Sequence, residues 1–184
     1  MPHIHTGKNQ YDFTTTLYVV RLAKDVPFAL LHFHRKHHIL LPVGGHIEIN
    51  ETPWKAAAHE LREESGYDLM QMSVLQPSPR IKQLSGVILH PSPLSINSHN
   101  ITNDHFHTDL SYAFIAEELP KYSIGNNESD DLRWLNLDEI HSLKSDEIYD
   151  NIREAYTFIM TTALHAWDRI PGTNFSYNEK TPPL

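Results

Sequence analysis

Three glutamates near the middle of the chain are spaced so that they could hold a cation together. Glu60, Glu63 and Glu64 lie three and four residues apart, which places them on one face of a helix. Like charges at these spacings are mildly destabilising, and a bound cation would remove the repulsion. Carboxylate oxygens suit hard divalent ions such as Mg²⁺ or Mn²⁺, which often take substrate phosphates as further ligands. A solvated helix face without chemistry is the competing interpretation.

The segment that carries these glutamates has helix signals at both ends. Thr52 is a good N-cap, Pro53 suits the first helical position, and Gly66 suits the end of the helix. Apolar residues within 53–65 recur at spacings of three and four, which predicts a helix with one face on a core. A double glycine at 44–45 comes shortly before, and it predicts a tight turn or a close approach to a ligand.

Taken together, these features resemble the Nudix box, the signature motif of the Nudix hydrolases. The matching positions hold Gly45, Glu51, Glu60, Leu61, Glu63, Glu64, Gly66 and Tyr67. The resemblance covers about residues 13–143 and implies an α/β fold, a Nudix-type α/β/α sandwich with a mixed central sheet. It further implies a hydrolase that cleaves a pyrophosphate linkage in a nucleoside diphosphate derivative, by attack of water on phosphorus. Mg²⁺ or Mn²⁺ would be the cofactor, and a small nucleotide-like molecule the substrate.

The same resemblance assigns the metal ligands. Glu60 and Glu64, one helical turn apart, are the main ligands that it implies, with Glu63 assisting. The carbonyl oxygen of Gly45 would contribute from the loop.

The resemblance also implies a general base that is either a glutamate of the box or an acidic residue of a later loop. Glu63 and Glu51 are the candidates within the box, and Glu128 is the favoured candidate outside it. Asp130 and Asp131 compete with Glu128 for this role.

One position departs from the family pattern. The box normally has arginine directly before its first terminal glutamate, and this chain has His59. Arginine is always charged and offers a planar fork of donors, whereas histidine offers at most two donors and is partly charged near neutrality. A protonated His59 near Glu51 or Glu63 could still orient them. The alternative function is a catalytically weak Nudix-fold module that binds nucleotides or regulates.

The chain is rich in histidine, with 14 residues of this type. They gather at positions 32–38, at 3 and 5, and at 105 and 107. Contact with substrate phosphate is one interpretation, with His34, Arg35 and His107 as candidate binding residues. Alternating histidines on a strand could instead bind Zn²⁺, Ni²⁺ or Cu²⁺, and exposed histidines without a role are the third possibility.

Composition excludes several other classes of protein. The 184 residues include 15 Lys and Arg against 23 Asp and Glu, so no overall basic field favours duplex DNA. The absence of cysteine excludes disulfides and thiolate metal sites, which favours a cytoplasmic protein. No apolar run approaches the roughly 20 residues that span a bilayer, so no membrane partner is expected. The sequence sets no oligomeric state.

The remaining pattern predicts one domain over 1–170, with a core of about 13–143 and a long C-terminal helix over 146–167. A loose tail is expected over 171–184 because it is rich in proline and poor in apolar residues. Strands are expected at 12–23, 28–33, 39–43, 69–75, 87–90, 108–117 and 133–135, loops at 91–103 and 122–131, and a short helix at 137–143.

Overall fold

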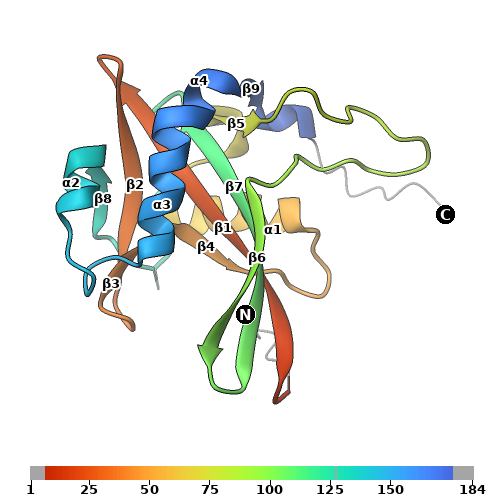
Figure 1. Cartoon of the computed structure of the whole chain (residues 1–184). Coiled ribbons are helices and arrows are strands. Elements are labelled where there is room, and N and C mark those ends of the chain that lie inside the picture. Colours follow the sequence, from red (N-terminus) through yellow and green to blue (C-terminus); the bar gives the residue numbers. More distant parts are fainter. Residues whose placement is uncertain (1–6, 127, 176–184) are drawn as a thin grey trace.

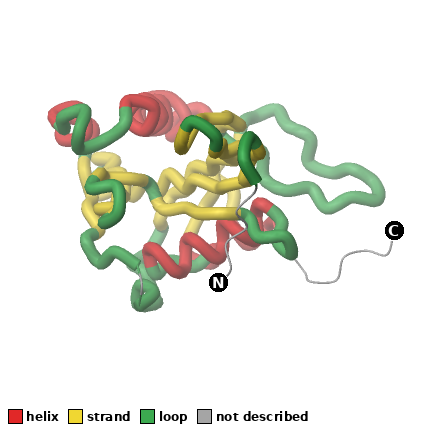
Figure 2. Tube along the Cα trace, turned by 90° about the horizontal axis from the view of Figure 1, so that it is seen from below, coloured by secondary structure: helices red, strands yellow, loops and turns green. Residues whose placement is uncertain are grey.

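The computed structural model describes residues 7–126 and 128–175 as a sheet between two layers of helices (Figure 1, Figure 2). This arrangement is the predicted α/β/α sandwich with a mixed central sheet. The strands are β1 (Gln10–Ala23), β2 (Val26–His34), β3 (Ile39–Leu41), β4 (Val43–His46), β5 (Met72–Gln76), β6 (Ser95–Thr102), β7 (His105–Ala116), β8 (Leu132–Leu135) and β9 (Asp168–Pro171). The helices are α1 (Pro53–Ser65), α2 (Leu137–Ser142), α3 (Asp150–Phe158) and α4 (Leu164–Ala166), with 3-10 turns η1 (Leu69–Gln71) and η3 (Gly172–Phe175) and a π-helical turn η2 (Ile159–Ala163).

The centre of the sheet is a long parallel pair, β1 and β7. The main strand order is β3-β2-β1-β7-β5-β9, and β4, β6 and β8 attach to β1, β7 and β2 respectively. β1 and β7 are in register from Gln10 opposite His105 to Arg21 opposite Ala116, and the other strand pairs of the described chain are antiparallel. Residues 10–21 and 105–116, which are far apart in the sequence, therefore lie side by side in the sheet.

Each face of the sheet is covered by its own apolar core. Leu17 and Val19 point to one face, where Trp54 and Leu61 of α1 pack on them. Alternate residues of the same strand point to the opposite face, because side chains along a strand change face at every step. There they pack against α2 and the helical run from α3 to α4. The two cores fix α1 and the C-terminal helices on opposite sides of β1.

Several predicted elements differ from the structure. The segment 91–103 contains β6, although a loop was expected, and residues 87–90 form no strand. The apolar run at 39–43 is divided into β3 and β4 at Pro42, whose missing N–H cannot join a ladder. The strand expected over 69–75 begins with the turn η1 before β5.

The end of the chain also departs from expectation. The C-terminal helix begins at Asp150 rather than at residue 146, and η2 interrupts its α-helical geometry. The expected tail over 171–184 is ordered in its first part, because Pro171 ends β9 beside β5 and η3 follows. The rest of that tail lies outside the described residues.

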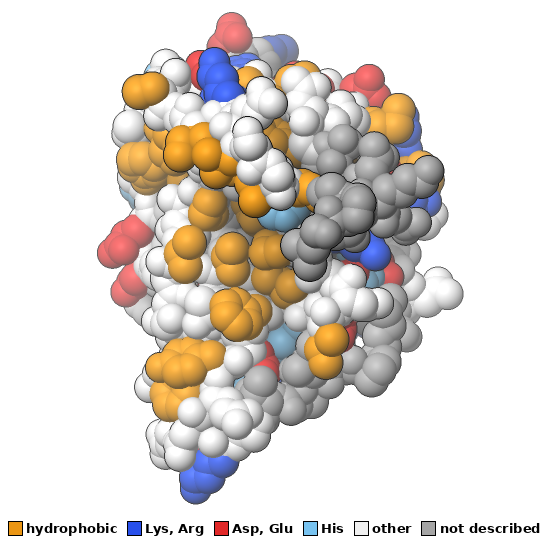
Figure 3. Space-filling model, turned by 90° about the vertical axis from the view of Figure 1, so that its right-hand side faces the viewer, with side chains coloured by type: hydrophobic (Ala, Val, Ile, Leu, Met, Phe, Trp, Pro, Cys, Tyr) orange, Lys and Arg blue, Asp and Glu red, His pale blue; other side chains and the backbone are white. Residues whose placement is uncertain are grey.

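The connection between β5 and β6 is long and carries exposed apolar side chains, Ile81, Leu84, Val87 and Ile88. One face of the molecule shows hydrophobic side chains in its middle and charged ones mainly towards its edge (Figure 3). In the described part of the chain, no helix combines the length and the apolar character that crossing a membrane requires.

Candidate active site on helix α1

Helix α1 is held in place by its caps and its apolar face. The hydroxyl of Thr52 accepts a hydrogen bond from the backbone N–H of Lys55 at 3.2 Å, and Pro53 follows at the first helical position. Gly66 ends the helix with φ of 71°, a left-handed conformation that suits glycine. Trp54 is fully buried and stacks on Phe114 of β7. The predicted helix over 53–65 is confirmed.

The double glycine of β4 lies directly against the carboxylates of α1. The backbone N–H of Gly44 donates to Glu64 Oε2 at 2.7 Å. A Cβ on Gly45 would lie 2.2 Å from Glu60 Oε1, so only glycine leaves this carboxylate its present place. A Cβ on Gly44 would lie 2.2 Å from the carbonyl oxygen of Thr15. The glycine pair lies within β4 rather than in a tight turn, and its close approach is to the protein's own glutamates rather than to a ligand.

Burial gives two of these glutamates unusual proton affinity. Burial is the largest cause that raises the pKa of Glu64 to about 9 and that of Glu60 to about 7, and the nearby charge of Glu128 contributes to both shifts. A cation that offsets their charge would favour the ionised form of both carboxylates near neutral pH. Glu51 Oε2 is buried as well and has no hydrogen-bond partner within the described residues. The donor set is all oxygen, which fits Mg²⁺ or Mn²⁺.

His59 lies between two glutamates of the predicted site. Its Nε2 is 3.0 Å from Glu63 Oε1 and its Nδ1 is 3.4 Å from Glu51 Oε1. Burial alone would lower the pKa of His59, but contact with Glu63 and the charges of Glu63, Glu60 and Glu51 together raise it. The carboxylates therefore favour the charged form of His59, which occupies the position at which the family pattern has arginine, and both of its nitrogens face carboxylates.

The loop between β7 and β8 is bound to the end of α1. The backbone N–H groups of Tyr122 and Gly125 donate to the carbonyl oxygens of Gly66 and Glu63, at 3.0 and 2.8 Å. These bonds satisfy carbonyl groups that a helix end leaves without partners. Glu128 of the same loop lies close enough to Glu64 to help raise the pKa of the Glu64 carboxyl. The loop is therefore part of the site.

The two competitors of Glu128 are engaged elsewhere. Asp130 pairs with Arg35 at 2.8 Å, and Asp131 pairs with Arg133 at 2.7 Å, both near the surface. The acidic residue that the loop turns toward the α1 carboxylates is Glu128.

The histidine-rich end of β2 also reaches this site, through His32, a member of the 32–38 group that is not among the candidate binding residues named from the sequence. His32 is buried, and its Nε2 lies 4.0 Å from Glu64 Oε2. Burial and then the neighbouring His34 lower the pKa of His32 to about 4, so its ring is neutral. His34 is half-buried beside it, and Arg35 is mostly exposed in its pair with Asp130. The alternation of side chains along β2 could have indicated that His32 faces the site, because His32 and His34 lie on the same face of the strand.

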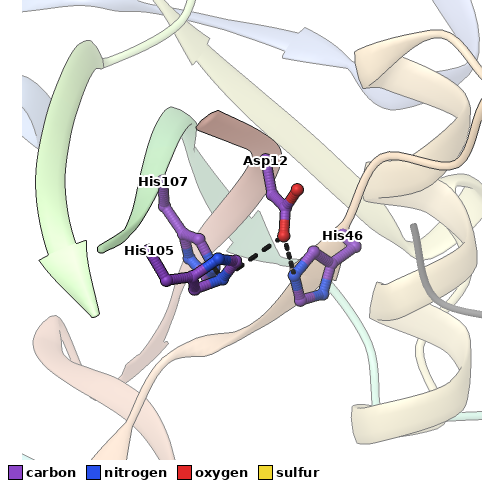
Figure 4. Close-up of side chains that lie close together, drawn as sticks. All are labelled: Asp12, His46, His105 and His107. Carbon is purple, nitrogen blue, oxygen red and sulfur yellow. Dashed lines mark hydrogen bonds and ion pairs between the residues drawn. The ribbon is translucent and has the colours of Figure 1, made fainter. Parts of the chain in front are cut away.

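The third predicted substrate residue, His107, lies in a different group. It belongs to a cluster with Asp12, His46 and His105 in which the side chains converge (Figure 4). His46 is opposite Thr14 in the β1–β4 register, whereas Gly45 is opposite Thr15. The cluster therefore lies on the sheet face opposite to that of α1.

The comparisons with known proteins agree with this geometry. The family model described as NUDIX domain matches residues 15–156. A Nudix family hydrolase from Clostridium perfringens has a similar structure, with a TM-score of 0.65 and 27% identity over 82% of this chain and 99% of that one. The comparison with curated protein sequences found no match.

Two more distant structures share the fold. An Ap4A hydrolase from C. elegans has a TM-score of 0.62 and 14% identity, covering 85% of this chain and 100% of that one. The dihydroneopterin triphosphate pyrophosphohydrolase of E. coli has a TM-score of 0.54 and 19% identity, covering 85% and 99%. With the family model spanning most of the chain and the box residues assembled around α1, this protein belongs to the Nudix family.

Proposed function

We propose that this Nudix pyrophosphohydrolase depends on Mg²⁺ or Mn²⁺ and cleaves a nucleoside diphosphate derivative. The observation that carries the proposal is the packing of Glu60 and Glu64 against the two glycines of β4. Burial raises the pKa of both side chains, so the metal-free site favours protons where the reaction needs carboxylates. A divalent cation resolves this conflict.

Four residues would hold the ion. They are Glu60, Glu63, Glu64 and Gly45, the last through its carbonyl oxygen. When bound, such an ion supplies charge neutralisation at the phosphate oxygens, the main requirement of phosphoryl transfer.

Residues of the chain provide the positioning and the proton transfer. His59, in contact with Glu63 and Glu51, fixes the orientation of both carboxylates. Glu128 is our candidate for the general base, because its loop is hydrogen-bonded to α1 and its carboxylate reaches Glu64. It would take a proton from the attacking water as the new P–O bond forms. The bond between phosphorus and the bridging oxygen breaks, and the leaving phosphate departs with its electron pair.

The basic end of β2 is our candidate for binding substrate phosphate. His34 is the last residue of the strand that places His32 next to Glu64, and Arg35 follows it directly in the turn after β2. The names of two structural relatives, an Ap4A hydrolase and a dihydroneopterin triphosphate pyrophosphohydrolase, support a nucleotide-type substrate with a pyrophosphate linkage. His107 is not included here because it faces the other side of the sheet.

The test is a panel of nucleoside diphosphate derivatives incubated with the purified chain and Mg²⁺, with phosphate-containing products measured. Glu64→Gln should lower turnover by about 100-fold or more, because a metal carboxylate becomes a neutral amide. Glu154→Gln, an exposed position on α3, is the matched control and should keep full activity. If no substrate is turned over and Glu64→Gln binds nucleotide as well as wild type, the protein is a binding or regulatory module instead.

A further inference from the structure

Three strands bring one carboxylate and three imidazoles together at the end of the sheet remote from the α3–α4 helices (Figure 1, Figure 4). Asp12 of β1 is directly opposite His107 of β7 in the parallel register, and His105 is two residues earlier on the same face. His46 of β4 is opposite Thr14, two residues after Asp12. Regular strand alternation, on three separate segments of the chain, therefore produces the cluster.

The distances between the polar atoms are those of ligands around one small ion. His105 Nε2 lies 3.2 Å from His107 Nε2 and 3.3 Å from Asp12 Oδ2, and Asp12 Oδ2 lies 3.6 Å from His46 Nε2. One ligand atom from each of the four residues falls within 4.8 Å of all the others. Tetrahedral Zn²⁺ with bonds of about 2.0–2.1 Å separates its ligand atoms by roughly 3.3 Å, which matches these values.

A neighbouring carboxylate shows what a purely structural buried aspartate looks like in this sheet. Asp109 lies one step further along the same β1–β7 face, and three hydroxyl groups donate to it, from Thr14, Thr16 and Ser111, at 2.6–2.9 Å. Asp12 is equally buried, with 2% of its surface exposed against 3% for Asp109. Its carboxylate instead faces imidazole nitrogens, which are the commonest metal ligands among side chains.

We propose that Asp12, His46, His105 and His107 form a Zn²⁺ site that is separate from the Nudix-box site. Three imidazoles and one carboxylate complete a tetrahedron, so the site is closed and its role is to hold strands together rather than to activate water. The ion would join β1, β4 and β7 where the sheet extends beyond its helices. His46, His105 and His107 are half-buried, which leaves a path for the ion from solvent.

The chemistry of the two sites differs enough to separate them. The box site offers only oxygen ligands and lies on the α1 face, whereas the new site is mainly imidazole and lies on the opposite face. Mg²⁺ prefers oxygen ligands, and Zn²⁺ accepts imidazole readily. A site for one ion need not compete with a site for the other.

The experiment uses the full chain without an affinity tag, stripped of metal and then titrated with Zn²⁺ against a chromophoric chelator. We expect one tight Zn²⁺ ion per chain, retained in excess Mg²⁺ and also in a Glu60→Gln/Glu64→Gln variant. His105→Gln and Asp12→Asn should each weaken binding by at least about 100-fold, since changes that do not even touch a metal cost 10–100-fold. His99→Gln is the matched control, because its ring centroid lies 5.5 Å from that of His107 but it is outside the cluster.

A second measurement tests the site without relying on His105→Gln and Asp12→Asn, which could fail to fold. Co²⁺ bound in place of Zn²⁺ should give the intense visible bands of tetrahedral coordination with nitrogen ligands in the wild-type chain, and these should persist in Glu60→Gln/Glu64→Gln. Tight binding that vanishes in Glu60→Gln/Glu64→Gln, or that stays intact in both His105→Gln and Asp12→Asn, would overturn the proposal. So would a wild-type chain that holds no Zn²⁺ after the chelator competition.

Discussion

Alanine substitutions at the two adjacent glycines of β4 should have different effects, a loss of activity at Gly45 and a loss of stability at Gly44. In Gly45→Ala the new methyl group would lie 2.2 Å from Glu60 Oε1 and 2.5 Å from its Cδ, where ordinary contacts begin at 3.4 Å. The carboxylate must therefore move by roughly 1 Å. Because the contact is made by the far end of the long Glu60 side chain, this side chain can move without disturbing the fold. The same movement takes the carboxylate out of its metal-binding position, and a misplacement of about 1 Å can lower the rate about 100-fold.

The assay compares Gly45→Ala with Gly44→Ala and wild type. Gly44→Ala should destabilise the fold itself, because its methyl group meets the backbone oxygen of Thr15 at 2.2 Å and the residue has φ of 153°. We expect Gly45→Ala to keep its thermal unfolding temperature within a few degrees while Mg²⁺-dependent hydrolysis falls about 100-fold. Gly7→Ala, where the added atom makes only ordinary contacts with Gln10, should change neither. Wild-type activity in Gly45→Ala, or unfolding of that variant, would refute the reasoning.

Three further predictions concern proton binding and packing. His59→Arg should retain activity and extend it to higher pH, because arginine stays charged where His59 loses its proton and its attraction to Glu63 and Glu51; a hundredfold loss at every pH would contradict this. In metal-free protein the pKa of Glu64 is raised to about 9, so the unfolded chain releases this proton at lower pH than the folded chain. The free energy of unfolding of wild type relative to Glu64→Gln should therefore fall between about pH 5 and pH 9, measured by urea denaturation in EDTA; a constant difference would be inconsistent with the burial. Tyr156→Phe should cost about 1–3 kcal/mol in the same denaturation assay, because the buried hydroxyl donates to a backbone carbonyl of β2 that would lose its partner; an unchanged midpoint would exclude that role.

The part of the site that lies within one helix could be predicted from sequence, because helical spacing is local. Glu60, Glu63 and Glu64 needed only the period of α1, and its ends were marked by Thr52 and Gly66. The sequence allowed for a His59 near Glu51 or Glu63, and in the structure His59 contacts both.

Other features depended on pairing between distant segments, which no local pattern encodes. β6 is exposed at every residue and mostly polar, with Ile96 and Ile101 as its apolar residues. It is held by edge pairing with β7, and it has no apolar alternation that would reveal it as a strand. The approach of His32 to Glu64 and of Asp12 to His107 depends on tertiary register. The late start of α3 reflects a turn at residues 145–147 and a bend at 148, where apolar spacing alone predicted helix.

The parallel pairing of β1 with β7 also bears on the order of folding. Its contacts join residues 95 apart in the chain, as between Thr14 and Asp109, whereas Gly44 and Glu64 are only 20 apart. Closing the longer loop costs more entropy, and pairings of this kind are slow to form. We therefore expect the β4–α1 unit to gain structure first and the Asp12–His107 contact to form late. A metal probe at that cluster would report the last stage of folding rather than the first.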